Sequence, residues 1–151
     1  MPHRPLGRLI AAAATAAVVL GCAACGSVPD YPILEPRASA EVPEHVYAMR
    51  SLDIALTSAS EGPVIVTGGT IFSPYFDRVD AVGLDVELAP GGSTTVTLPL
   101  GVVSCPAGEG DASAQLVLEV DGEELLQSVM LDAKGIRALN KEACELISER
   151  G

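Results

Sequence analysis

The chain has no tryptophan and few other aromatic or chemically reactive side chains. Aromatic residues make up 3% of its 151 residues, so a hydrophobic core must consist mainly of aliphatic side chains. Histidine occurs only at His3 and His45, too few for a histidine-based catalytic triad or a familiar zinc or copper site. Nucleophile-elbow, phosphate-loop and dinucleotide-binding motifs are also missing. We therefore predict no catalytic residues, no enzymatic activity, no cofactor and no metal.

Basic residues are also scarce. Nine lysines and arginines stand against 20 acidic residues, which gives a formal net charge of −11 at pH 7. Nucleic-acid binding requires clustered basic side chains that displace counterions from the phosphates, so we exclude nucleic acid as a partner. The simplest consequence of the acidic surplus is solubility. Recruitment of cations or of a basic partner is the more specific alternative.

Long apolar runs are confined to the N-terminus. Arg4 and Arg8 precede an apolar run from Leu9 to Leu20. This run is shorter than the roughly 20 residues of a membrane-spanning helix and has the length of a signal-peptide core. We therefore predict that residues 1–21 are a signal peptide.

A cysteine stands where this signal peptide would be cleaved. The residues Val19, Leu20, Gly21 and Cys22 resemble the lipobox of bacterial lipoproteins. The resemblance implies that the Cys22 sulfur carries a diacylglycerol, which inserts into membrane lipid and anchors the protein on the extracytoplasmic side of the cell membrane. Cys25 is the alternative lipidation site. Cleavage without lipidation, which would give a freely secreted protein, is the alternative fate.

The next segment has no periodicity that a helix or a strand could use. Between Ala23 and Pro43 four prolines lie among small and charged residues, namely Pro29, Pro32, Pro36 and Pro43. We predict that residues 22–45 comprise the lipidated cysteine and a flexible tether, and that the folded domain spans residues 46–151.

Alternation of apolar with small or polar residues dominates the first part of this domain and predicts half-buried strands. It is clear at residues 51–57, at 81–88 and at 96–100. In the second of these segments the apolar positions are Val82, Leu84, Val86 and Leu88. The pair Gly68 and Gly69 interrupts a further strand at 64–71, which indicates a bulge or a close backbone approach.

The last two strands are predicted to form a hairpin. Asp121 and Gly122 lie between apolar alternations at 116–120 and 125–131 and are typical turn residues. Loops of two and of four residues both fit, and we favour four because that loop pairs Val120 with Leu125. About six short strands with regular turns predict an all-β fold, an immunoglobulin-like β-sandwich.

After Gly135 the spacing changes to three and four residues, which predicts a short amphipathic C-terminal α-helix that packs on the sandwich. Its apolar stripe consists of Ile136, Leu139, Ala143, Leu146 and Ile147. With Cys22 and Cys25 in the lipidation region, Cys105 and Cys144 remain as a pair in an oxidising compartment. We predict that they form a disulfide that pins the helix. A redox-active or metal-binding thiol pair is the alternative.

Both phenylalanines and one tyrosine gather in one short segment. Phe72, Tyr75 and Phe76 surround Pro74, so the segment is predicted to be a turn. Aromatic side chains in a loop can form a binding anchor, and they can equally plug the open end of a sandwich. Both interpretations stay open, and these three residues are the candidate binding residues.

The run from Leu98 to Cys105, followed by Glu142, Ala143 and Cys144, resembles small exported proteins of actinobacteria that have no assigned activity. The resemblance supports the disulfide and the β-sandwich and transfers no functional residue. We therefore predict a membrane-anchored lipoprotein that acts as a non-enzymatic binding or assembly module for an unidentified membrane or surface protein. The alternative is a lipoprotein that binds a small ligand or a metal ion for a membrane transporter or enzyme.

Overall fold

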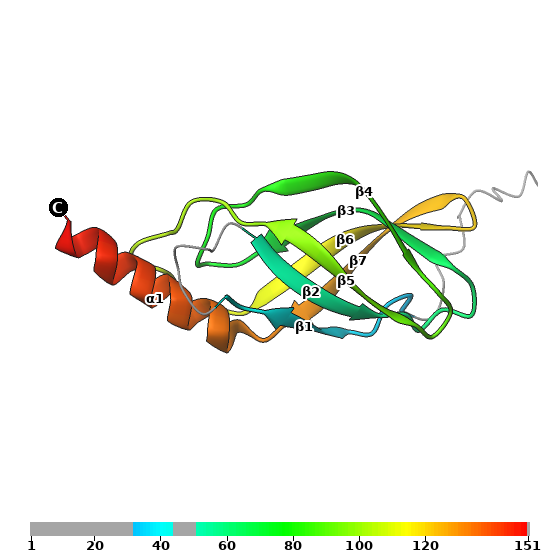
Figure 1. Ribbon diagram of the computed structural model, residues 1–151, viewed down its shortest axis with the longest axis horizontal. Coiled ribbons are helices and arrows are strands. Elements are labelled where there is room, and N and C mark those ends of the chain that lie inside the picture. Colours follow the sequence, from blue (N-terminus) through cyan, green and yellow to red (C-terminus); the bar gives the residue numbers. More distant parts are fainter. Residues whose placement is uncertain (1–31, 44–50, 151) are drawn as a thin grey trace, which may run out of the picture.

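The computed structural model describes residues 32–43 and 51–150. Within them, seven strands precede one helix (Figure 1). The elements are β1 (Arg37–Glu41), β2 (Ser51–Thr57), β3 (Val64–Phe72), β4 (Asp80–Leu88), β5 (Ser93–Pro99), β6 (Ala112–Val120), β7 (Glu123–Leu131) and α1 (Ala133–Glu149). The prediction of a mostly β fold with a C-terminal helix is confirmed.

The seven strands form one sheet in the order β4-β3-β6-β7-β1-β2-β5. The pair β1 and β7 is parallel, and the other neighbouring pairs are antiparallel. The sheet curls on itself into a nearly closed barrel, and α1 lies at one end of it (Figure 1). The edge strands β4 and β5 follow each other in the chain and are joined by a short turn at residues 89–92.

The folded domain begins earlier than the sequence predicted. Ile33 and Leu34 are buried in the core, and β1 lies between β7 and β2. The prediction of a flexible tether is therefore wrong for residues 33–41. The inward residues of β1 are Ala38 and Ala40, which are too small to give a strong alternation. Hydrogen bonding to two neighbouring strands stabilises β1 instead. The predicted signal peptide, Cys22 and Cys25 lie outside the described residues.

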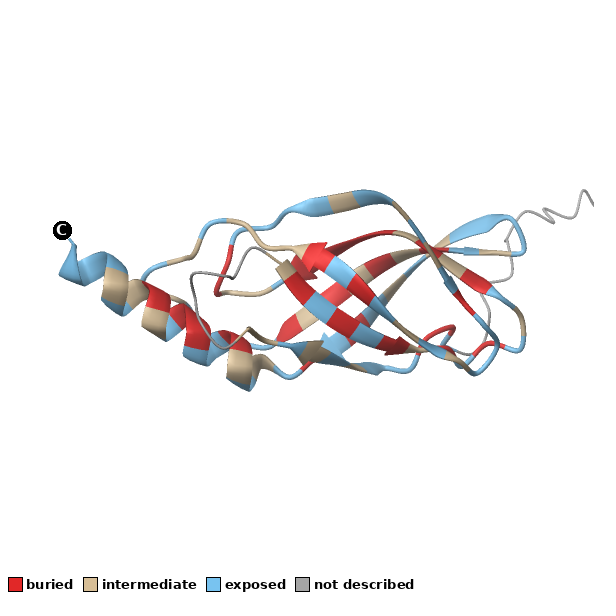
Figure 2. Cartoon of the chain, in the orientation of Figure 1, coloured by how far each residue is buried: buried red, intermediate tan, exposed pale blue. Residues whose placement is uncertain are grey.

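The core fills the barrel with aliphatic side chains, as the shortage of aromatic residues predicted. Buried residues alternate with exposed ones along β2 and β5 and with partly buried ones along β6 (Figure 2). The largest fully buried aliphatic side chains are Leu34, Leu52, Ile54, Leu56, Leu88, Leu98, Leu116, Leu118 and Ile136. Each such side chain contributes about 1.5–3 kcal/mol through removal of its surface from water.

The predicted bulge in β3 is confirmed, and it moves one predicted core residue to the surface. The register of β3 against both β4 and β6 shifts between Val66 and Gly68. On β4 the chain passes through a positive φ of 68° at Gly83. Just before this irregularity Ala81 packs against the core, whereas Val82 is 84% exposed. The simple alternation assigned Val82 to the wrong face because it assumed an unbroken period of two.

The β6–β7 hairpin is tighter than we favoured from the sequence. Val120 pairs with Glu123, so the loop consists of Asp121 and Gly122 alone. Their φ angles are 52° and 79°, and positive values at both positions define the type I′ turn that matches the twist of the flanking strands. The four-residue loop that pairs Val120 with Leu125 is therefore wrong. The turn preference of Asp-Gly outweighs the gain from that apolar pair.

The C-terminal helix follows its prediction over its first half. The Asp132 side chain accepts a hydrogen bond of 3.0 Å from the Lys134 amide, which is the expected N-cap contact. Ile136 and Ala143 are buried, but Ile147 is 54% exposed. The predicted apolar stripe is wrong for Ile147, because the end of α1 extends beyond the barrel (Figures 1 and 2).

Candidate functional site at the helix end of the barrel

The loops of the domain gather at two opposite ends. We call the end formed by residues 58–63, 89–92 and 121–122 the turn end, because tight turns close it. The other end contains the loops 73–79 and 100–111 together with α1, and we call it the helix end (Figure 1). Of the candidate site residues within the described ranges, Tyr75, Phe76, Cys105 and Cys144 lie at the helix end, and Phe72 is the last residue of β3.

The predicted disulfide is present and crosses the helix end. Cys105 and Cys144 are joined with an S–S distance of 2.03 Å and a Cα–Cα distance of 5.6 Å. Cys105 belongs to the loop 100–111 and Cys144 to α1. The bridge therefore fixes the middle of the helix against the loop that follows β5.

Tyr75 forms the centre of this end. Its side chain is buried, and its hydroxyl donates a hydrogen bond of 2.8 Å to the Gly110 carbonyl. The same hydroxyl oxygen accepts a hydrogen bond of 2.8 Å from Arg137 Nε, and the guanidinium carbon lies 5.8 Å from the centre of the tyrosine ring. The hydrogen bond to Tyr75 raises the pKa of Arg137 above its ordinary value. One tyrosine thus joins two loops to the helix.

Asn140 links the same three segments from the helix side. It is 3% exposed, and its Nδ2 donates hydrogen bonds of 2.9 Å to the carbonyls of Tyr75 and Ser104. Within residues 32–43 and 51–150, no buried side-chain nitrogen or oxygen lacks a hydrogen-bond partner. The polar groups of the helix end are therefore held in one arrangement.

A pocket of about 430 Å³ opens between α1 and the loop 100–111. Ligand pockets in proteins commonly measure about 300–1,000 Å³, so a small organic molecule or a protruding side chain fits this volume. Arg137 and Lys141 project from α1, one turn apart, and Glu109 and Glu145 also line the pocket. The remaining lining residues are Tyr75, Pro106, Ala107, Gly108, Asn140, Cys144 and Ser148. The pocket can hold a polar or charged group against a rigid wall.

The aromatic segment divides between the core and the surface. Tyr75 and Phe76 are buried at the helix end, the position that the plug interpretation requires. Phe72 is 38% exposed, and the Arg78 guanidinium carbon lies 5.1 Å from the centre of its ring. Of the three candidate binding residues, Phe72 presents the most aromatic surface to solvent, and Tyr75 contributes to the pocket lining.

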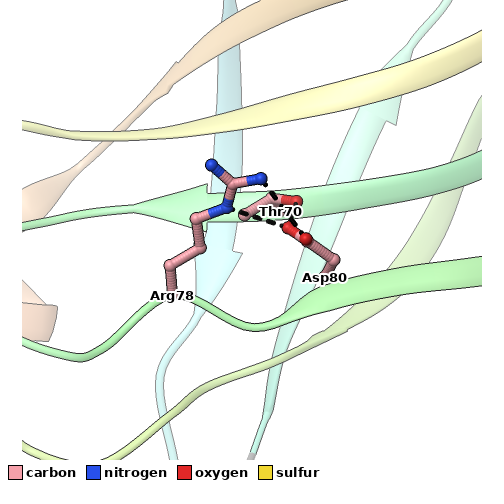
Figure 3. A network of polar contacts seen from close by, with 3 residues as sticks. All are labelled: Thr70, Arg78 and Asp80. Carbon is pink, nitrogen blue, oxygen red and sulfur yellow. Dashed lines mark hydrogen bonds and ion pairs between the residues drawn. The ribbon is translucent and has the colours of Figure 1, made fainter.

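Arg78 also contacts Asp80, at the start of β4 (Figure 3). Arg78 Nε and Nη2 donate to the two carboxylate oxygens over 2.9 Å and 3.3 Å, and the Thr70 hydroxyl donates to Oδ1 over 2.6 Å. The hydrogen bonds from Arg78 and then from Thr70 lower the pKa of Asp80. Because both charged side chains are more than half exposed, this cluster adds little stability.

Two residues of the helix end were not identified from the sequence. Arg137 and Asn140 lie on the predicted helix, but no role was predicted for either residue. Asn140 had a detectable signal, because it lies four residues after Ile136 and so falls within the apolar stripe, where a buried amide must find partners. The contacts of Arg137 have no comparable signal, since they depend on where Tyr75 lies.

The described residues contain neither a cluster of metal ligands nor a membrane-spanning helix. No three histidine, cysteine, aspartate or glutamate side chains gather closely enough to bind a metal ion within the described ranges. The helix in the described part of the chain is also not long and apolar enough to cross a membrane.

The comparisons with known proteins add little to this geometry. The sequence matches no family model and no curated protein. Among solved structures, 67% of the chain is similar to part of a GH20 exo beta-N-acetylglucosaminidase from Vibrio harveyi in complex with N-acetylglucosamine, with a TM-score of 0.38 and 12% sequence identity. The chain covers 18% of that enzyme. A likeness of this size supports no inference about function.

Proposed function

We propose that this chain is a lipoprotein, anchored through Cys22 to the extracytoplasmic side of the cell membrane, whose domain is a non-enzymatic binding or assembly module. One observation carries the proposal: the described chain enters the domain at the turn end. The Ile33 carbonyl accepts a hydrogen bond of 2.9 Å from Ala59, and Leu34 bridges to Ser58. The pocket lies at the opposite end.

This placement suits an N-terminal anchor. A strand of nine residues, such as β6, spans about 30 Å. An anchor that leaves the domain at the turn end would therefore hold the helix end about that much farther from the membrane. The pocket and the exposed part of α1 would then face a partner at the cell surface and not the lipid.

We also propose that the module is an immunoglobulin-like sandwich in which β4-β3-β6-β7 packs on β1-β2-β5. The change of partner within β1 supports this assignment. Its residues Arg37 and Ala38 pair with β7, and its residues Ser39 to Glu41 pair with β2. A strand that leaves one set of strands and joins another is suited to connect the two layers of a β-sandwich.

The chemistry of the pocket favours binding over catalysis. A nucleophilic mechanism needs an activated hydroxyl or thiol next to a base. Cys144 is held in a disulfide, and the Ser148 hydroxyl donates to the Glu145 carbonyl within its own helix, over 2.7 Å. The Tyr75 hydroxyl is bonded to Gly110 and Arg137. These groups hold the pocket in shape.

The alternative function is a lipoprotein that carries a small ligand or a metal ion for a membrane transporter or enzyme. The size of the pocket favours its small-ligand form. Arg137 and Lys141 lie one turn apart in the pocket lining, which is an arrangement that suits an anionic group. Native mass spectrometry of the protein purified from its own cells would reveal such a ligand as added mass, lost in Arg137→Gln.

The anchor is tested by the chemistry of its N-terminal peptide. We expect mass spectrometry of the membrane fraction to find a diacylglycerol on Cys22. Cys22→Ala should move the protein to the soluble fraction, and the matched variant Cys25→Ala should leave it in the membrane. A soluble wild-type protein, or retention of Cys22→Ala in the membrane, would contradict the anchor.

The module is tested with a photo-reactive residue placed at Lys141 on intact cells. A matched variant carries the same residue at Glu123, at the turn end. We expect a reproducible adduct with one protein from position 141, absent from position 123 and lost in the Cys22→Ala background. Equal adducts from both positions would contradict the assignment of the helix end as the binding surface.

A further inference from the structure

The outward face of β4, β3, β6 and β7 carries its side chains in rows that cross the strands. One row is apolar. Leu126 on β7 pairs with Val117 on β6, Val117 pairs with Gly68 on β3, and Gly68 pairs with Val82 on β4. Neighbouring strands are about 4.8 Å apart, so the members of this row are close neighbours. We call these four residues the apolar row.

The apolar row is open to solvent at its two ends. Val82 is 84% exposed and Leu126 is 64% exposed. Between them Gly68 is buried and Val117 is partly buried. Val117 Cγ2 lies 3.5 Å from where a Cβ of Gly68 would be, so the middle of the row is continuous but less exposed. Single exposed apolar residues are common on protein surfaces, whereas a connected set is a feature of interaction sites. The irregularity in β4 that exposes Val82 also aligns it with this row.

An acidic row lies directly beside it, toward the turn end. Glu124 pairs with Glu119, Glu119 pairs with Ile65, and Ile65 pairs with Glu87. The three glutamates are exposed, and none of them forms an ion pair with another described residue. Like charges directly opposite each other on a sheet are destabilising. The protein therefore carries an acidic row beside an apolar row whose two ends are exposed, although neither the like charges nor the exposed apolar side chains favour folding.

We propose that this face binds a protein segment in which apolar side chains lie next to lysines or arginines. The apolar row would pack against the apolar side chains, and the acidic row would pair with the basic ones. Charge complementarity selects this occupant: a second copy would bring glutamates toward glutamates, and the chain as a whole carries a net charge of −11. This surface lies outside the pocket, so the proposal goes beyond the function proposed above and does not depend on the anchor.

The partner is expected to lie on the face and not to extend the sheet. β4 is an edge strand, but positive φ angles at Gly83 and Asp85 interrupt its extended backbone. Irregular edges of this kind hinder the addition of another strand. Side-chain contacts with the two rows, and not backbone pairing, would then carry the recognition.

The experiment uses the Cys22→Ala protein and two short peptides, one of alternating leucine and lysine and one of alternating leucine and glutamate. Two-dimensional NMR should show amide shifts at the apolar and acidic rows with the lysine peptide, and none with the glutamate peptide. Glu119→Gln together with Glu124→Gln should weaken binding about tenfold, and Leu126→Ser should weaken it by a similar factor. The matched control is Glu109→Gln together with Glu145→Gln, which removes the same charge at the pocket.

Three results would overturn the proposal. Equal weakening by the control pair would mean that net charge alone attracts the peptide. Shifts centred on the pocket would place the binding elsewhere. A dimer in sedimentation experiments, with shifts on this face that depend on protein concentration, would make a second copy its occupant. The anchor and cross-linking experiments can succeed or fail independently of these results.

Discussion

The two ends of the barrel are closed by different means. At the turn end the chain reverses within a few residues, and the tightest turn is Asp121 and Gly122 alone. At the helix end the loops are longer, and residues far apart in sequence close them. Tyr75 contacts Asn140 and Arg137, and a disulfide spans 39 positions. Local backbone preference thus forms one end, and tertiary contacts form the other.

The ends also differ in their basic residues. Four basic residues lie on α1 or at its C-cap, namely Lys134, Arg137, Lys141 and Arg150. The turn end includes Glu61, Asp121 and Glu123, and the acidic row lies beside it. Both ion pairs between described residues, Arg78 with Asp80 and Lys141 with Glu145, belong to the helix end. The basic side chains thus belong to the helix end, where they lie among acidic residues that include Glu142, Glu145 and Glu149.

The largest expected effect is removal of the disulfide. Cys105→Ser together with Cys144→Ser should lower the free energy of unfolding by about 4 kcal/mol, because the unfolded chain loses the closure of a loop of about 40 residues. Chemical denaturation of the Cys22→Ala protein measures this loss, with Cys25→Ser as control. Hydrogen exchange should accelerate mainly in α1 and the loop 100–111. Equal acceleration in the β6–β7 hairpin would contradict the separation of the two ends.

The packing of the helix gives the next largest effect. Ile136 lies in the first half of α1 and is fully buried, whereas Ile147 lies near the end of α1 and is 54% exposed. Ile136→Ala should cost about 3 kcal/mol of stability, because it opens a cavity in the core. Ile147→Ala, the same substitution on the same helix, should change stability by less than about 0.5 kcal/mol. Similar losses from the two variants would show that the last turns of α1 pack more closely than their exposure indicates.

Two amide side chains, Asn140 on α1 and Gln127 on β7, bridge backbone groups that are distant in sequence. Removing each should cost a different amount of stability. Asn140 is buried and serves two carbonyls. Gln127 is half-buried and exchanges two hydrogen bonds of 2.8 Å with the backbone of Leu34. We expect about 2 kcal/mol for Asn140→Ala and about 1 kcal/mol for Gln127→Ala, since the Gln127 side chain is only half-buried and water can enter the space that it leaves. Thermal unfolding of both variants tests the order, and a larger loss at Gln127 would contradict it.

A smaller loss of stability is expected at the turn end, where it tests whether the backbone conformation of one turn residue matters by itself. Gly122 has a φ of 79°, and no atom lies within 4 Å of where its Cβ would be. Gly122→Ala should therefore cost about 1 kcal/mol from backbone strain alone. Gly62 has equally open space without a positive φ, so Gly62→Ala should cost nothing measurable. Equal losses from the two variants would show that the turn conformation is not the cause.

Sequence reasoning succeeded where the structure depends on local pattern. The alternations at 51–57 and 96–100, the bulge at Gly68 and the helical stripe after Gly135 all correspond to observed elements. The cysteine pair was predictable too, since the other two cysteines lie in the predicted lipidation region. In each case, a short stretch of residue types contained enough information.

Sequence reasoning failed where tertiary contacts override a weak or misleading local signal. β1 has only small inward residues, so no pattern distinguished it from a tether. Val82 continues an apolar alternation that the irregularity of β4 breaks. The pocket joins α1 to a loop that is separated from it by two whole strands. Its position could not be derived before the fold was known.

The smallest expected effect is the pH dependence that comes from Asp80. It tests whether the helix end is also ordered by charge. Hydrogen bonds from Arg78 and Thr70 lower the pKa of Asp80 below its ordinary value. A carboxyl group whose pKa is lower in the folded state stabilises the fold above its unfolded pKa of about 3.9, and this contribution is lost as the pH falls through the folded value. NMR titration of the Asp80 carboxyl carbon should therefore give a midpoint below about 3.9. Arg78→Gln should raise that midpoint, and Arg150→Gln, which removes an equal charge elsewhere, should not. An unchanged midpoint in Arg78→Gln would mean that the loop 73–79 is positioned by Tyr75 and Phe76 alone, and that packing and not charge orders this end.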